Sequence, residues 1–394
     1  MIKKLASVKW QHYLNYVVIG IITIVLTIMA LTSNPVGLSK TLTNLVTNTG
    51  IAIILATSLS MVVGFLGELS LGHAGFMCVG AYMGGKTAVV LYDMFEGFGL
   101  PDAVAEPLGL VAALIVGGLA AMAAGFIIGL PALRLKGDYL AIVTLAFGEI
   151  VRIIFLNSGG VFGDSSGFKT PRYDKSVFFI IILVMVLITL FVLQNLMRSK
   201  HGRAITAIRD SEIAAKATGI NVTKYKLWVF AIAALFAGIA GVLHSFNTPA
   251  KIYADTFDYN YSIEILVMVV LGGMGSINGS IIMAVVITFI NTMLQTQLQG
   301  GMAVLKNLIY ALILIVMVVY NNAPALKPFR EKYNLKNLFT KIFKRSSDPN
   351  RHRDDEAKWD RVPTKIRMDE VLSVDIQVKS PYTPDKAEKG DENE

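Results

Sequence analysis

The chain has 394 residues, of which 54% are hydrophobic and 16% charged, and its mean hydropathy is +0.58. Because soluble proteins carry about 25% charged residues, this composition indicates a membrane protein. The formal net charge of +8 does not favour nucleic acid as a partner, since the basic residues cluster in short loops beside hydrophobic stretches, which is typical of membrane orientation. The one cysteine, Cys78, excludes an intrachain disulfide and a cysteine-based metal site.

Hydrophobic stretches that suit membrane spans follow one another along the chain, each span needing about 20 mostly apolar residues. We count ten, near 12–32, 44–66, 74–92, 108–130, 139–156, 176–197, 227–247, 262–274, 277–299 and 303–321. The stretch near 262–274 is the weakest of them as a span. We expect no cleavable signal peptide, because the first apolar run continues into a full span. The sequence therefore predicts an all-α polytopic membrane protein with about ten transmembrane helices, give or take one pair.

The charges of the connecting loops support this count. Lys and Arg gather at the N-terminus and in 134–136, 198–226 and 327–345, whereas 93–107 is acidic and contains neither Lys nor Arg. With ten spans, all the basic loops fall on one side of the membrane, which is the cytoplasmic side. Both termini are therefore predicted to be cytoplasmic.

Two glycine-rich segments, Leu66–Tyr82 and Leu271–Gly279, lie in different halves of the hydrophobic region. Irregular backbone inside a bilayer is tolerated only where protein or a water-filled cavity satisfies its polar groups, and paired interruptions are typical of transporters. We therefore expect two glycine-broken segments that line a substrate path. The predicted path residues are Ser70, Gly72, His73, Gly75, Gly272, Gly273 and Gly275. The alternative is close helix packing, for which membrane helices also use glycine.

Three further features have plain structural interpretations. His73 has no second ligand at metal-binding spacing, which favours a hydrogen-bonded structural role. Glu149 and Arg152 are spaced to pair on one helix face, either as a functional group or as a structural pair at the membrane interface. The segment Gly163–Thr170 resembles a phosphate-binding loop, but Phe168 separates the glycine from the lysine and no strand precedes it. We reject it as a nucleotide site.

The longest basic loop, 198–226, contains a short predicted helix. Asp210 or Ser211 can cap its start, and Gly219 can end it in a left-handed conformation. Its alanines give a small-residue surface that a partner can approach closely, with Ile213 and Ile220 as apolar anchors. The alternative is an ordinary surface helix that links two spans.

From about Pro324 the chain is polar and mixed in charge, with about half of all the acidic residues beyond Lys327. We expect a transmembrane domain over 1–323 and a polar cytoplasmic tail over 324–394 that is largely disordered. The basic start of the tail is expected to lie at the anionic lipids of the inner leaflet.

Over about residues 40–320 the chain resembles the inner-membrane permease subunits of the branched-chain amino-acid ABC transporters. Four segments carry the resemblance: GELSLGHAGFMCVGAY (67–82), GDYLAIVTLAFGEIVRI (137–153), RAITAIRDSEIAAKATGINVTKYK (203–226) and LGGMGSINGS (271–280). The resemblance implies the ABC importer permease fold. It also implies a segment that docks on the ATPase, formed by Glu212, Ala214, Ala215 and Gly219. The tail beyond about residue 330 is longer than the family leads us to expect.

The resemblance also implies partners. These are separate ATP-binding subunits, a second homologous permease subunit, and a periplasmic substrate-binding protein. The binding protein would contact loop 157–175, for which the alternative is an ordinary solvated loop. ATP would be hydrolysed on the separate subunits, so we expect neither an enzyme nor a cofactor on this chain. Its membrane would be the bacterial inner membrane, and nucleic acid is not expected as a partner.

The resulting prediction is a subunit of an importer for leucine, isoleucine or valine. A member of the same family carrying urea, amides or other amino acids is the nearest alternative. An ion-coupled secondary transporter would need carboxylates near the bilayer midplane, and Glu68 is the one such residue near a glycine-rich segment. A structural or assembly membrane protein would need no path.

Overall fold

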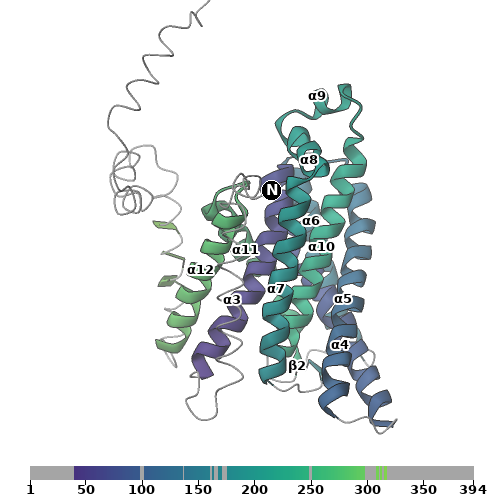
Figure 1. Cartoon of the computed structure of the whole chain (residues 1–394), viewed down its shortest axis with the longest axis vertical. Helices are drawn as coiled ribbons and strands as arrows, with labels where there is room; N and C mark the ends of the chain where they lie inside the picture. Colours follow the sequence, from purple (N-terminus) through teal and green to yellow (C-terminus); the bar gives the residue numbers. More distant parts are fainter. Residues whose placement is uncertain are drawn as a thin grey trace, which may run out of the picture. The chain divides into compact units, whose positions relative to one another are not determined.

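A computed structural model of the chain describes residues 40–97, 102–135, 137–159, 162–163, 167–170, 175–247 and 251–297, together with 308–309, 311–312 and 315–316 (Figure 1). All of these belong to one compact unit, Met1–Asn321. The expected span near 12–32 and the expected tail 324–394 lie outside the described residues.

The described residues are mostly helical. The helices are α3 (Lys40–Ser60), α4 (His73–Gly97), α5 (Asp102–Ala132), α6 (Asp138–Leu156), α7 (Lys175–Arg198), α8 (Lys200–Asp210), α9 (Glu212–Ala217), α10 (Val222–Asn247), α11 (Tyr259–Gly272) and α12 (Ile277–Gln297). The helix α3 continues into a π-helical segment, η1 (Met61–Leu66), and a short 3-10 helix, η3 (Ala254–Phe257), precedes α11.

Seven helices of the described part are long and apolar enough to cross a membrane. They contain Thr43–Leu66, His73–Phe95, Ala105–Ala132, Asp138–Leu156, Phe178–Arg198, Val222–Asn247 and Ile277–Leu294. The shorter α11, with 14 residues, falls on the stretch that was the weakest span in the sequence. Of the expected span near 303–321 only three dipeptides are described, and these are helical.

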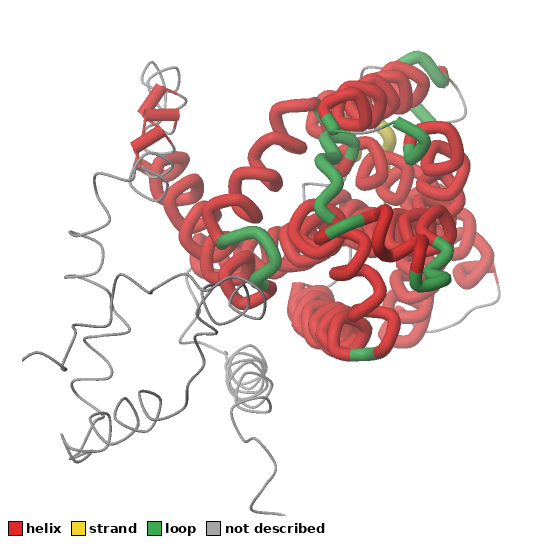
Figure 2. Tube along the Cα trace, turned by 90° about the horizontal axis from the view of Figure 1, so that it is seen from above, coloured by secondary structure: helices red, strands yellow, loops and turns green. Residues whose placement is uncertain are grey.

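Helix α10 packs against α5, α4 and α3, while α12 packs against α3 and α11 (Figure 1). Seen from above, the described part consists almost entirely of helices (Figure 2). Small residues let these helices approach closely. A Cβ atom added to Gly125 of α5 would lie 2.5 Å from the Cβ of Ala234 in α10. Ala234, Ala237 and Ala240 of α10 are fully buried, so this face of α10 forms the core of the helix bundle.

Two short strands join loops that are far apart in sequence. Phe168–Lys169 (β1) pairs antiparallel with Lys251–Ile252 (β2), and Phe168 lies opposite Ile252. The lysine of the segment that resembles a phosphate-binding loop is therefore part of a strand. In a phosphate-binding loop the lysine instead lies at the start of a helix, which agrees with our rejection of a nucleotide site.

Candidate functional site

The basic loop 198–226 contains the predicted short helix, α9. Of the two predicted caps it is Ser211 that caps it, since its Oγ accepts a hydrogen bond from the Ala214 amide at 3.3 Å. Gly219 follows with φ +85°, and the Ile220 amide donates to the Ala215 carbonyl. The capping residue and the left-handed glycine define both ends of a helix that is too short to be stable by itself.

Only part of α9 faces outward. Ala214 is exposed, and Ile213 has 84% of its surface exposed, so these two residues form a surface open to a partner. Ala215 is only 3% exposed, and Ile220 packs against the hydrophobic core. A short helix that lies on a protein must bury one face. Ile220 is half-buried and contacts the core, so of the two predicted anchors Ile213 is the more exposed, and the role of Ile220 stays a prediction.

Glu212, the first residue of α9, is held by two lysines. Its carboxylate lies 3.0 Å from the Nζ of Lys216 and 3.3 Å from the Nζ of Lys226. The hydrogen bond from Lys216, followed by that from Lys226, lowers the pKa of Glu212 below its ordinary value against the opposing effect of burial. Glu212 is therefore a carboxylate at neutral pH, with a cation on each side of it.

Lys226 also forms an ion pair with Glu68, which lies at the start of the first glycine-rich segment. The side chain of Lys226 is 6% exposed and that of Glu68 12%. Sequence reasoning did not find this pair. Its signal was a lysine in the first turns of a hydrophobic helix, where a charge requires a partner.

Arg209, at the end of α8, lies where the two glycine-rich segments meet. Its Nη1 donates to the Gly64 carbonyl at 3.1 Å. A Cβ atom on Gly64 would lie 2.5 Å from the Gly275 amide nitrogen, and one on Gly275 would lie 3.2 Å from the Arg209 Nη1. η1, which leads into the first glycine-rich segment, therefore contacts the second segment, more than 200 residues later in the sequence, beside the loop that contains α9.

The first glycine-rich segment leaves the helical conformation at residues 67–72. Its backbone is satisfied by protein, since the Leu71 amide donates to Thr144 Oγ1 and the Ala74 amide to Ser262 Oγ, both at 3.0 Å. His73 is 1% exposed, and its Nε2 lies 2.8 Å from Ser58 Oγ. This contact agrees with the structural role favoured for His73. Within the described ranges no three His, Cys, Asp or Glu side chains gather as a metal site would require.

The predicted path residues fall into separate contacts. Gly72 and Gly75 pack against α6, where added Cβ atoms would lie 2.5 Å from the Thr144 carbonyl oxygen and 2.5 Å from the Gly148 Cα, respectively. Gly272 packs against Gly279 and Ser280, whereas Gly273 (φ +92°) has open space around it. Ser70 is buried, and its Oγ has no hydrogen-bond partner in the described part of the chain. The packing alternative accounts for Gly72, Gly75 and Gly272 in this conformation, while the path remains a prediction.

Glu149 and Arg152 form the predicted pair at 2.9 Å, and Arg152 also binds Asp255 at 2.8 Å. The second carboxylate oxygen of Glu149 accepts the Tyr259 amide at the start of α11. These contacts tie α6 to η3 and α11, which is the structural role left open by the sequence.

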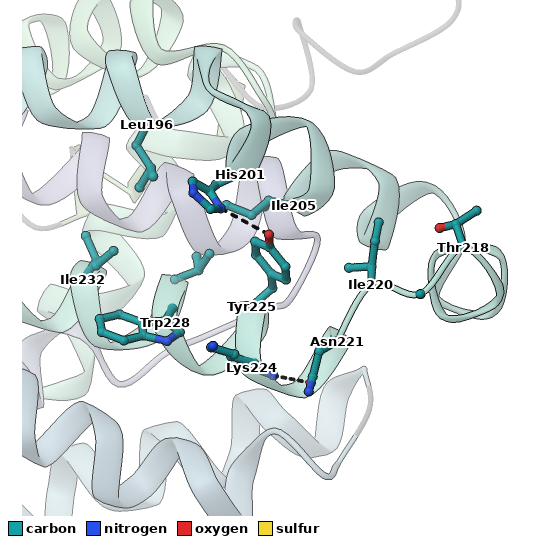
Figure 3. Close-up of a pocket in the computed structure, with 12 residues that line it drawn as sticks. Leu196, His201, Ile205, Thr218, Ile220, Asn221, Lys224, Tyr225, Trp228 and Ile232 are labelled. Atoms are coloured by element: carbon teal, nitrogen blue, oxygen red, sulfur yellow. Dashed lines mark hydrogen bonds between the residues drawn. The ribbon is translucent and has the colours of Figure 1, made fainter.

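A cavity of about 670 Å³ lies beside α9. Its walls come from the end of α7, from α8, from the turn after α9 and from the start of α10. Figure 3 shows the side chains that line it, including His201, whose Nδ1 lies 3.1 Å from the Tyr225 hydroxyl. Thr218, Gly219 and Ile220 form the wall that belongs to the turn after α9. The turn therefore borders open space on the side facing α8.

Several apolar helices of spanning length, a glycine-rich segment with buried irregular backbone, and a capped helix exposed on a basic loop together define a multi-pass membrane protein of the permease class. The family model described as "Branched-chain amino acid transport system / permease component" matches residues 41–319. The chain belongs to this family and is a transport component rather than an enzyme.

The chain is similar to several proteins that are named as transport permeases. The high-affinity branched-chain amino acid transport system permease protein LivM of Escherichia coli (strain K12) is 33% identical over 335 residues, which cover 77% of this chain and 74% of the relative. The probable branched-chain amino acid transport permease protein LivM of Methanocaldococcus jannaschii is 29% identical over 257 residues, 58% of this chain and 74% of the relative. The ribose import permease protein RbsC of Escherichia coli (strain K12) is 28% identical over 145 residues, 35% of this chain and 44% of the relative. No solved structure is significantly similar to the chain.

Proposed function

We propose that the chain is the permease subunit of an ATP-driven importer that moves branched-chain amino acids inward across the plasma membrane. Family membership supports the transport role, and the names of the relatives support branched-chain amino acids as the substrate class. The substrate would pass from an external binding protein into a path between this chain and a second, similar permease. The lipid bilayer surrounds the spans, and no cofactor is needed on this chain.

The observation that carries the coupling role is the exposed surface of α9. Ala214 is small and open to solvent, and the neighbouring Ile213 offers a fully accessible apolar side chain. The cap at Ser211 and the left-handed turn at Gly219 hold this surface in one conformation. The ATP-binding subunit would dock here, which places the loop 198–226 on the cytoplasmic side. With the ten spans expected from the sequence, both termini would be cytoplasmic as well.

Ala214→Arg tests this docking. The long charged side chain would hold the ATPase away, while the spans are untouched because Ala214 is exposed. We expect near-normal membrane levels, loss of the ATP-binding subunit on co-purification, and loss of leucine uptake. Ala214→Ser, which keeps the residue small, is the matched control. Normal uptake by Ala214→Arg would sink the docking proposal.

The path would lie at the two glycine-rich segments, as breaks within spans that move during alternating access. The buried, unpartnered hydroxyl of Ser70 supports a polar element there. Ser70→Ala should raise the KM for uptake in proteoliposomes and leave docking unchanged. An unaltered KM would remove Ser70 from the path.

An ion-coupled mechanism is less well supported, because its candidate carboxylate, Glu68, is bound to Lys226. Uptake that depends on ATP and is unchanged by an imposed proton or sodium gradient would support the ATP-driven importer over the ion-coupled transporter. Urea or another amide as substrate remains the alternative within the family. Competition of leucine, urea and acetamide for uptake decides between them.

A further inference from the structure

One lysine holds two carboxylates that belong to different parts of the proposed machinery. The Nζ of Lys226 binds Glu68, which opens the segment 67–72, and lies 3.3 Å from Glu212, the first residue of α9. An ammonium group has three donors in a compact arrangement, so it can serve both acids at once. Because Lys226 and Glu68 are 6% and 12% exposed, water screens this network far less than an ordinary surface ion pair.

Besides this contact, α9 packs against α8 and has one buried side chain. Ala215 is its buried residue, and the turn that follows, Thr218–Ile220, borders the cavity of about 670 Å³ (Figure 3). The turn therefore has open space on the side facing α8, so a movement of α9 is transmitted least through that wall. The contact between Glu212 and Lys226 lies where α9 begins and is a polar link between α9 and α10.

The other carboxylate, that of Glu68, belongs to a segment in which neighbouring residues are also held by hydrogen bonds. The Glu68 amide donates to the Val62 carbonyl at 3.1 Å, and three residues later the Leu71 amide is bound by Thr144. His73, where α4 begins, is bound to Ser58. Since only four residues separate Glu68 from His73, a displacement of the Glu68 carboxylate is passed to the start of α4.

We propose that Lys226 is the positioning residue that transmits movement of α9 to the first glycine-rich segment, by holding Glu212 and Glu68 on one ammonium group. This inference rests on the proposed docking of the ATP-binding subunit at α9. It makes Lys226 a residue of coupling and not of docking, because its side chain is buried. The network has two discrete links, and each can be removed without removing the other.

The choice of variants follows from the charges. Lys226→Gln alone leaves Glu68 nearly buried and unneutralised, which destabilises the fold regardless of coupling. Glu68→Gln combined with Lys226→Gln removes both charges and leaves two amides that can bond to each other, while Glu212 keeps Lys216 as its cation. Glu212→Gln weakens the contacts of Glu212 with both Lys226 and Lys216 and preserves the buried pair of Lys226 and Glu68. Lys200→Gln, an exposed residue on α8, controls for the loss of one positive charge from the loop.

The test measures uptake of radiolabelled leucine by the complete complex, which is reconstituted in proteoliposomes with its ATP-binding subunits and binding protein. For Glu68→Gln/Lys226→Gln, whose two positions lie outside α9, we expect wild-type co-purification of the ATP-binding subunit and continued ATP hydrolysis. Uptake should fall about tenfold, in the range of ordinary coupling energies, so that more ATP is consumed per leucine. Lys200→Gln should behave as the wild type.

Two results would overturn the proposal. Normal uptake by the double variant, or by Glu212→Gln if the double variant does not fold, would show that the network is only structural. Loss of the ATP-binding subunit from Glu212→Gln would place that carboxylate in the docking contact. Failure of Ala214→Arg to disturb docking is a different result, because it rules out the proposed docking at α9 itself. A loss of uptake in the Glu68, Lys226 and Glu212 variants would then be explained by lower stability of the protein.

Discussion

The guanidinium of Arg209 donates to the carbonyl oxygen of Gly64 at 3.1 Å, between residues 145 positions apart in the chain. Gly64 has no side chain, and this lets the backbone of Gly275 approach it closely. The same guanidinium binds the neighbouring carboxylate of Asp210 at 3.1 Å. A planar, multidentate cation is suited to hold a carboxylate and a carbonyl in fixed directions. Arg209 thus ties the end of α8 to both glycine-rich segments.

Arg209→Lys should weaken this junction although it keeps the charge. A lysine offers one ammonium in place of the planar fork, so it cannot hold Gly64 and Asp210 together in the same geometry. We expect leucine uptake to fall several-fold at near-normal membrane levels. Arg203→Lys, at an exposed position on the same helix, is the control and should have no effect. Equal uptake by the two variants would show that the contact between Arg209 and Gly64 is incidental.

Ala215→Arg should fail for a reason different from that of Ala214→Arg. Ala215 is 3% exposed, so the substitution forces a charge into a packed contact and costs roughly 3 kcal/mol or more of stability. We expect a lower membrane level and a lower Tm in detergent, together with lost uptake. The comparison is made by fluorescence size-exclusion chromatography of both variants. A stable Ala215→Arg protein would mean that α9 does not lie on the protein as described.

Local rules predicted the ends of α9 well, and they could not predict what its faces contact. Ser211 and Gly219 follow from short-range hydrogen bonding and backbone sterics, and the pair of Glu149 and Arg152 follows from helix spacing. Whether Ala215 or Ala214 faces inward depends on how the loop rests on other helices. The pair of Lys226 and Glu68 joins residues 158 positions apart, and no local pattern in one sequence specifies such a partner.

The predicted path residues show the same limit. The glycines indicated segments whose backbones approach each other closely, as the backbones of Gly75 and Gly148 do. Composition alone does not distinguish an approach of two helices from an approach of backbone to substrate, because both require the absence of a side chain.

Gly72→Ala separates these two roles. The added Cβ would lie 2.5 Å from the Thr144 carbonyl oxygen, and overpacking of this kind costs about 1–3 kcal/mol. If Gly72 serves packing, the Tm and the uptake should fall together. Gly97→Ala, at the far end of α4 with nothing within 4 Å of the new Cβ, should leave both unchanged. A variant that keeps its Tm but loses uptake would instead support the substrate path.

The last prediction concerns the turn at Gly219, where conformation alone can be varied. Gly219 has φ +85°, and an added Cβ would meet nothing within 4 Å, so the effect of a substitution comes from backbone strain and not from a clash. Alanine in a left-handed conformation costs about 1–2 kcal/mol, whereas asparagine tolerates that conformation better because its side chain can hydrogen-bond locally. We therefore expect Gly219→Ala to loosen the end of α9 and weaken co-purification of the ATP-binding subunit, with Gly219→Asn closer to the wild type. Gly219 is exposed and lies outside the spans, so membrane levels should be the same for both. If alanine and asparagine weaken docking equally, Gly219 is needed for close approach of the partner and not for its left-handed backbone.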